Sequence, residues 1–392
     1  MVENTRQEKS VKINGLNLVY LDWGNEEKMP LLCLHGHGSQ AHVFDEFGEA
    51  MSPYYRVLAL NQRGHGGSDW AADGYARATG KVGVCFGTSG PGATNLVTGI
   101  ATAQMDSVPL VVVTGQVPRP AIGTDAFQET DIFGITLPIV KHSWVIRNPS
   151  DIARVVSQAF FVASSGRPGP VLIDIPKDVG QEFFNYEKVL PCETIPKGFK
   201  RLGEINEEDV NKAVELIKNS QKPLLYVGGG AIASGAHEQL KTLSRDCQIP
   251  VTTTLMGKGI FDERDDLSVG MLGMHGTAYA NFAVTECDLL IAVGARFDDR
   301  VTGKLDTFAP KAKVIHIDID PAEVNKNRRV DVAIVSDVSE ALSKINFIFK
   351  KNPSEPRTSS WLDKIKFWKN KHPLFTPPED GEIYPQEVLI KL

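Results

Sequence analysis

The sequence AADGYARATGKVGVCFGTSGPGATNLVTGIATAQMDSVPLVVVTGQ occupies residues 71–116 and alternates between helical and strand periodicity. A helical pattern covers residues 71–79, and an apolar strand pattern covers residues 82–86. After a turn, a second helical pattern covers residues 95–105 and a second strand pattern covers residues 109–114. This order predicts a β-α-β unit and therefore an α/β fold with a parallel sheet.

The turn inside this stretch reads GTSGPGATN over residues 87–95. It follows a predicted strand and opens a predicted helix, so its small residues would let a ligand approach bare backbone. A plain tight turn between a strand and a helix explains the same residues equally well. The turn alone therefore leaves both interpretations open.

Composition limits the class of protein. A length of 392 residues allows two or three domains, and a net charge of −6 without a basic run argues against a nucleic-acid partner. The five cysteines never form a CxxC spacing and are expected to be buried thiols of a reducing compartment: Cys33, Cys85, Cys192, Cys247 and Cys287. The polar N-terminus fits neither a signal nor a transit peptide, and the apolar runs are too short to span a membrane. We expect a cytoplasmic enzyme.

Four strings in unbroken order carry a family resemblance: AADGYARATG, GTSGPGATNLVTGIATA, PLVVVTGQV and AFQETD. They resemble the large, catalytic subunit of acetolactate synthase, a thiamine-diphosphate enzyme of isoleucine and valine synthesis, and the resemblance runs from about Ala71 onward. It implies two doubly wound parallel-sheet domains: a pyrimidine-binding domain over residues 71–189 and a central FAD-binding domain over residues 206–350. Residues 190–205 are expected to be a linker. Residues 351–392 are expected to be a second linker, toward a missing diphosphate-binding domain.

The first seventy residues resemble the N-terminal part of an α/β-hydrolase instead. The loop His35-Gly36-His37-Gly38-Ser39 follows a predicted strand, and a second glycine-rich turn covers residues 61–69. A hydrolase also needs a G-x-S-x-G nucleophile elbow, and the nearest match, residues 87–91, has proline in place of the second glycine. We therefore expect a hydrolase-like segment fused into the first domain. Its residues 30–60, in strand-helix-strand order, could fill the missing place in the parallel sheet.

The fusion affects the expected chemistry. In the family, a glutamate just before the A-D-G-Y-A helix hydrogen-bonds the aminopyrimidine ring and promotes the tautomer that deprotonates the thiazolium. His65 stands close to the aligned position here, and the only carboxylate nearby is Asp69. We expect cofactor contacts to survive while turnover does not. A non-catalytic flavin-binding or subunit-pairing fragment and an α/β-hydrolase remain as alternatives.

The resemblance also assigns site residues in the first domain. Thiamine diphosphate would contact Ser89, Gly90, Pro91, Gly92, Asn95 and Gln116. Phe127 and Gln128 would face the reacting centre, and Lys141 would lie near the substrate entrance. The sequence alone favours a core aromatic for Phe127, and a solvated strand end explains Lys141 equally well.

The second domain contains Gly228-Gly229-Gly230-Ala231, which formally fits a dinucleotide pattern but lacks an acidic residue about twenty positions on. A nicotinamide site is therefore not expected. Loops at successive strand ends should converge on one crevice, and the resemblance implies that FAD is held there as a structural cofactor. The implied FAD residues are Arg167, Gly228, Gly229, Gly230, Thr254, Leu255, Met256, His275, Gly276, Arg296, Asp298, Arg300, Asp318, Ile319 and Asp337. Ordinary turns and surface salt bridges are the alternative.

The family reaction decarboxylates pyruvate and joins the resulting two-carbon unit to a second 2-oxo acid, giving 2-acetolactate and CO2. By resemblance, Mg2+ would be held in the missing third domain, and this chain itself is expected to supply no metal ligand. A homo-oligomer and a regulatory small subunit are the implied partners.

Overall fold

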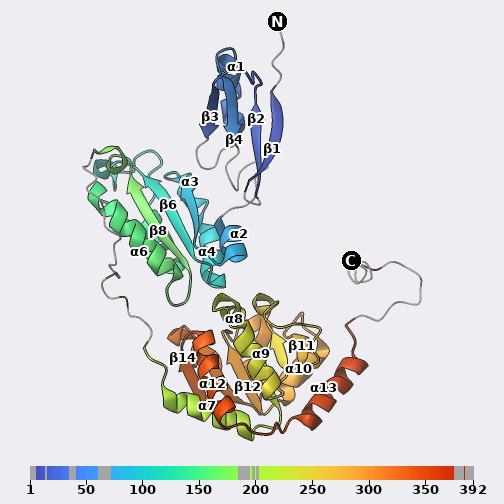
Figure 1. The fold of residues 1–392 in the computed structure, drawn as a ribbon. Coiled ribbons are helices and arrows are strands. Elements are labelled where there is room, and N and C mark those ends of the chain that lie inside the picture. Colours follow the sequence, from blue (N-terminus) through green and yellow to red (C-terminus); the bar gives the residue numbers. More distant parts are fainter. Residues whose placement is uncertain are drawn as a thin grey trace. The chain divides into compact units, whose positions relative to one another are not determined.

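The computed structural model describes residues 6–13, 16–34, 41–60, 72–183, 195–196, 199, 203–374 and 384. The chain divides into two compact units, Met1–Lys200 and Arg201–Leu392 (Figure 1). Each unit is described by itself below. None of the described helices combines the length and apolar character needed to cross a membrane.

The N-terminal part of the first unit forms a four-stranded mixed sheet with strand order β1-β2-β4-β3. Its elements are β1 (Gln7–Ile13), β2 (Leu16–Asp22), β3 (Pro30–Leu34), α1 (Asp45–Met51) and β4 (Arg56–Leu60). The hairpin β1-β2 is antiparallel, β2 pairs antiparallel with β4, and β3 pairs parallel with β4. A small core forms around Leu21, Trp23 and Val57.

This pairing overturns one expectation. The sequence allowed residues 30–60 to fill the missing place in the parallel sheet of the first domain, but β3 and β4 belong to a separate sheet. In that sheet β4 pairs with β3 on one side and with β2 of the hairpin β1-β2 on the other. His35, His37, His65 and Asp69 lie outside the described residues.

The rest of the first unit is a parallel sheet with strand order β5-β6-β8-β7, which confirms the predicted parallel α/β fold. Its elements are α2 (Ala72–Thr79), β5 (Gly83–Gly87), α3 (Pro91–Thr94), α4 (Val97–Asp106), β6 (Leu110–Gln116), α5 (Ile132–Thr136), β7 (His142–Val145), α6 (Ile152–Ser164) and β8 (Pro170–Pro176). One face packs on α2, α4 and α5, and the other packs on α6. The β-α-β unit predicted from residues 71–116 is present, with its second helix divided into α3 and α4.

The second unit is a six-stranded parallel sheet with strand order β11-β10-β9-β12-β13-β14. Its strands are β9 (Pro223–Val227), β10 (Val251–Thr253), β11 (Ser268–Met271), β12 (Leu289–Val293), β13 (Lys313–Asp318) and β14 (Val332–Val335). One face packs on α7 (Glu207–Asn219), α8 (Gly229–Ala233), α9 (His237–Asp246) and α12 (Val338–Lys351). The other packs on α10 (Ala278–Glu286) and α13 (Ser359–Lys371), while α11 (Asp299–Thr302) follows β12. The strand order reverses between β9 and β12, so this is a doubly wound sheet.

Helices α7 and α13 are the first and last described helices of the second unit. Asn206 caps α7, because its side chain accepts a hydrogen bond from the Glu208 amide. Helix α13 lies inside residues 351–392, which were expected to be linker. Trp361, Ile365 and Trp368 are spaced so that they share one helix face, and all three are buried against the sheet and α10. The expectation of a linker is therefore wrong for residues 359–371.

Candidate functional site

The glycine turn after β5 lies at the carboxyl edge of the parallel sheet in the first unit. Gly90 has a φ of +63° and precedes Pro91, the first residue of α3. A Cβ at Gly90 would lie 2.8 Å from the backbone oxygen of Gln128. Positive φ and close backbone contact both require glycine here. The structure thus brings the predicted cofactor turn and Gln128 together, while Pro91 and Asn95 are exposed beside them and Gly92 is buried.

The loop that carries Phe127 and Gln128 is held by its own carboxylate. Glu129 accepts hydrogen bonds from the amides of Thr124 (3.2 Å) and Ala126 (3.0 Å), and also from the Gly123 amide. These amide donors hold the pKa of Glu129 below its usual range. Gln128 adopts a φ of +61°, an uncommon backbone conformation for a residue other than glycine. Phe127 is 90% exposed, so the alternative of a core aromatic is wrong.

Gln116 lies at the end of β6, but its side chain is engaged inside the protein. Its Nε2 donates to the Thr130 carbonyl at 2.9 Å and to Asp174 Oδ2 at 3.1 Å, and its Oε1 accepts from the Val117 amide. Asp174 also accepts from the Thr114 hydroxyl at 2.6 Å. Burial raises the pKa of Asp174 to about 6, against the lowering effect of these two donors. This network fastens the loop after β6 to β8, and it leaves Gln116 no amide proton for a ligand.

Lys141 and Arg167 lie at the opposite, amino edge of the same sheet, because they precede β7 and β8. The Lys141 ammonium donates to the carbonyls of Val162 and Ser165 at the end of α6, where it complements the helix dipole. Arg167 donates through Nε to the Ser107 hydroxyl at 2.9 Å. Neither residue is therefore brought together with Phe127 and Gln128.

In the second unit, the predicted FAD loops meet at one sheet edge. All neighbouring strands are parallel, so the segments that follow them share the carboxyl edge. Glycines allow these loops to touch: a Cβ at Gly230 would lie 2.8 Å from Gly294 Cα, and one at Gly229 would lie 3.1 Å from Met256. Gly294 has a φ of +54°. Because glycine has no side chain, the neighbouring loops can pack directly against these residues, and Gly294 can adopt its positive φ.

The side chains at this edge divide into apolar and charged groups. Leu255, Met256 and Met274 are exposed large apolar side chains. Arg296 is 33% exposed in its side chain and lies 3.8 Å from Asp298, while Arg300 is largely exposed. His275 is exposed and Gly276 half-buried, and Ile319 is half-buried after β13. Exposed apolar groups beside cations suit a ligand with flat rings and phosphates, so these residues fit a flavin dinucleotide.

Four acceptors predicted to meet this ligand are engaged in turns or helix caps. Asp318 accepts from the Asp320 amide at 2.9 Å, Asp337 caps α12, and Thr254 accepts from the Gly257 amide at 3.1 Å. Asp298 likewise accepts from the Arg300 amide at 2.8 Å and caps α11. Their first role is therefore to shape the loops.

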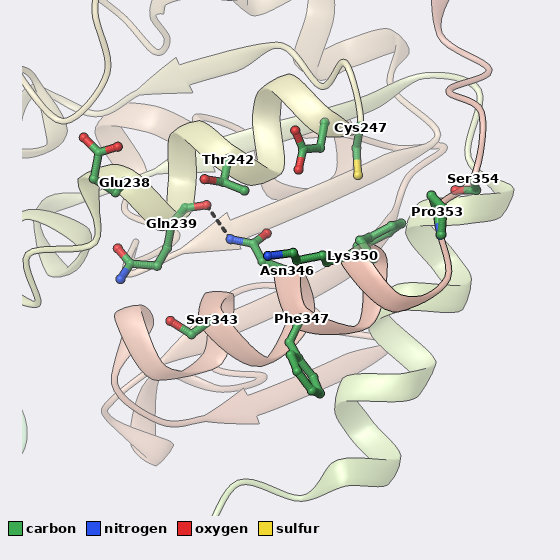
Figure 2. A pocket seen from close by; sticks show the side chains of 12 residues that line it. Glu238, Gln239, Thr242, Cys247, Ser343, Asn346, Phe347, Lys350, Pro353 and Ser354 are labelled. Atoms are coloured by element: carbon green, nitrogen blue, oxygen red, sulfur yellow. Dashed lines mark hydrogen bonds between the residues drawn. The ribbon is translucent and has the colours of Figure 1, made fainter.

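A hollow of about 740 Å³ lies elsewhere, in the helical layer of the second unit. Figure 2 shows its lining by α9, α12 and the segment after α12, with Asn346 donating to the Gln239 carbonyl at 2.9 Å. None of the predicted site residues lines it. Burial raises the pKa of its Cys247 thiol to about 12, so that thiol is unreactive at neutral pH. We do not place the reaction there.

Comparison with known families agrees with the two-domain architecture. Residues 28–135 match the family model described as thiamine pyrophosphate enzyme, N-terminal TPP binding domain. Residues 210–345 match the model described as thiamine pyrophosphate enzyme, central domain. The chain is built from thiamine pyrophosphate enzyme domains. Thiamine pyrophosphate is the same coenzyme as thiamine diphosphate, so the suspected family resemblance is confirmed at this level.

Several curated acetolactate synthases are similar in sequence to most of this chain. The chain is 64% identical over 368 residues to the acetolactate synthase large subunit of Parasynechococcus marenigrum, covering 91% of this chain and 60% of that protein. It is 56% identical over 361 residues to the acetolactate synthase large subunit of Porphyra purpurea, covering 89% and 61%. It is 50% identical over 365 residues to an acetolactate synthase of Mycobacterium bovis, covering 89% and 58%. The chain therefore spans about three fifths of the length of these curated relatives.

The match to the thiamine pyrophosphate enzyme family begins earlier in the chain than the sequence predicted. The N-terminal thiamine pyrophosphate domain match begins at residue 28, not near Ala71 as expected. The first relative matches 91% of the chain, and the unmatched remainder is shorter than the first seventy residues. Residues 28–60 therefore align with the family in sequence, although their strands pair with the β1-β2 hairpin. The likeness of residues 1–70 to a hydrolase stays a prediction.

Proposed function

We propose that this chain supplies the pyrimidine-binding and FAD-binding domains of an acetolactate synthase-type enzyme, which condenses two pyruvates to 2-acetolactate with loss of CO2. The observation that carries the proposal is the carboxyl edge of the second sheet, where Arg296 and Arg300 lie on loops beside exposed Leu255, Met256 and Met274. The apolar side chains would face the flavin rings, and the arginines would answer the pyrophosphate. The flavin would be structural, because the reaction involves no net redox change.

In the first unit, Ser89, Gly90 and the loop with Phe127 and Gln128 would contact thiamine diphosphate. When bound, that cofactor supplies the carbanion chemistry of the decarboxylation. Exposed Phe127 would shield the reacting centre from water. His65 stands near the position of the family's activating glutamate. This position lacks the carboxyl that the family uses to hydrogen-bond the ring, so we propose that this chain binds its cofactors without turning over pyruvate by itself.

Flavin binding tests the proposal. Purified chain should retain or take up FAD, seen as flavin absorbance that elutes with the protein. Arg296→Ala should weaken FAD binding roughly tenfold or more, because a hydrogen bond to a charged group contributes about 1.5–3 kcal/mol. The matched control is Arg264→Ala, whose exposed side chain pairs with Asp262 far from the strand-end loops. Chain that binds no FAD, or equal weakening by both substitutions, would contradict the proposal.

A further inference from the structure

The segment after β12 is held through three consecutive backbone carbonyls. His316 Nε2 lies 3.1 Å from the Ala295 oxygen, Tyr226 Oη donates to the Arg296 oxygen at 2.6 Å, and Asn327 Nδ2 donates to the Phe297 oxygen at 2.7 Å. The three donors come from β13, from β9 and from the segment before β14. Three separate parts of the sheet therefore fix one short loop.

Two of the three donors are fully buried, and Asn327 is exposed. Tyr226 and His316 both have 0% exposure. Because a carbonyl oxygen can only accept, His316 must carry its proton on Nε2, and its Nδ1 has no hydrogen-bond partner among the described residues. A buried polar atom without a partner is costly. The hydrogen bond from Nε2 to Ala295 offsets part of this cost, and Asp318 Oδ2 lies 3.7 Å from the same nitrogen.

Aromatic packing reinforces the hydrogen bonds. The Phe297 ring lies 5.2 Å from the His316 ring and 5.8 Å from the Tyr226 ring, measured between centroids. Ala295 and Phe297 are buried, whereas the alternating residues Arg296 and Asp298 are half-exposed. The inner side of the segment is thus fixed by both its side chains and its carbonyls. Arg296 is left with its guanidinium on the outer side.

We infer that Tyr226, His316 and Asn327 are positioning residues that hold Arg296 ready for the pyrophosphate of a dinucleotide. The inference rests on the proposed flavin function. A long arginine side chain has much rotamer freedom, and a fixed backbone reduces the entropy lost when it binds an anion. The three residues act through Arg296 and need not touch the ligand themselves.

The test compares two ligands and two matched variants. Tyr226→Phe removes one hydroxyl that donates to a carbonyl of the Arg296 loop. Ser244→Ala also removes a fully buried hydroxyl that donates to a backbone carbonyl, that of Ile249 at 2.8 Å, at the amino edge of the same sheet. Tyr226→Phe should weaken FAD binding roughly fivefold and leave riboflavin, which has no phosphate, unchanged. Ser244→Ala should leave both affinities unchanged, although it lowers the melting temperature.

A double-mutant cycle completes the test. If Tyr226 acts through Arg296, its effect on FAD binding should disappear in the Arg296→Ala background. Equal weakening of FAD and riboflavin, or an effect of Tyr226→Phe that persists without Arg296, would overturn the inference and leave the flavin proposal standing. Wild-type chain that binds no FAD would overturn both.

Discussion

At the scale of single residues, folding changes the proton affinity of the Asp174 carboxyl. It is buried at 1% exposure and bound by Thr114 and Gln116, and burial raises its pKa from 3.8 to about 6. The folded chain therefore holds the Asp174 proton more tightly than the unfolded chain does. Its contribution to stability is present below pH 3.8 and is lost as pH rises through about 6.

This shift predicts a flatter pH profile for Asp174→Asn. A difference of about two pKa units corresponds to about 3 kcal/mol of unfolding free energy between pH 4 and pH 7. Asp174→Asn should remove most of this decrease in unfolding free energy with rising pH, measured by urea unfolding at a series of pH values.

Asp178→Asn is the matched control. The hydrogen bond from Arg119 holds the pKa of Asp178 below its usual range, so its stabilising effect is present at neutral pH and is lost as pH falls. That substitution should change the slope in the opposite sense. Parallel profiles for wild type and Asp174→Asn would show that Asp174 does not titrate as described.

Other residue roles could not be read from the sequence. Tyr226, His316 and Asn327 belong to no motif, and each acts only because folding brings it to the segment after β12. For Lys141 and Arg167, the sequence already indicated the edge of the sheet at which each residue lies. Both directly precede strands of a parallel sheet, which places them at the amino edge, away from the turn at Gly90.

At the scale of elements, local periodicity predicted strands over residues 82–86 and 109–114, which correspond to β5 and β6. Residues 223–227 are likewise apolar throughout and form β9. The pairing of β4 was missed because strand-helix-strand order fixes which elements exist but not which edge they join. Helix α13 was missed because lysines and nearby prolines masked three apolar residues spaced by three or four positions.

Helix α13 should stabilise the second unit and is not merely a linker. Trp361 is 1% exposed, and its indole donates to the Pro223 carbonyl at 3.0 Å. Trp361→Ala should cost about 3–5 kcal/mol of unfolding free energy, as large-to-small core substitutions do. Phe367→Ala, at a 60% exposed position of the same helix, should change stability by less than about 0.5 kcal/mol. A similar small effect at Trp361 would mean that α13 is not docked.

At the scale of the whole molecule, the chain combines the N-terminal TPP binding domain and the central domain of thiamine pyrophosphate enzymes, each containing a parallel sheet. Sequence resemblance identified both domain types. It could not reveal that β1 to β4 form a sheet of their own, because that depends on a hairpin outside the family pattern. Under the proposed function, cofactor binding and turnover are separated in this chain, and His65 is the residue on which that proposal depends.

The most direct measurement is acetolactate formation by the purified chain, detected as acetoin after acidification. The assay contains pyruvate, thiamine diphosphate, magnesium and FAD, and a parallel sample with added active acetolactate synthase shows that the reagents support turnover. We predict no product above the protein-free blank. Product that requires both this chain and thiamine diphosphate would contradict the account.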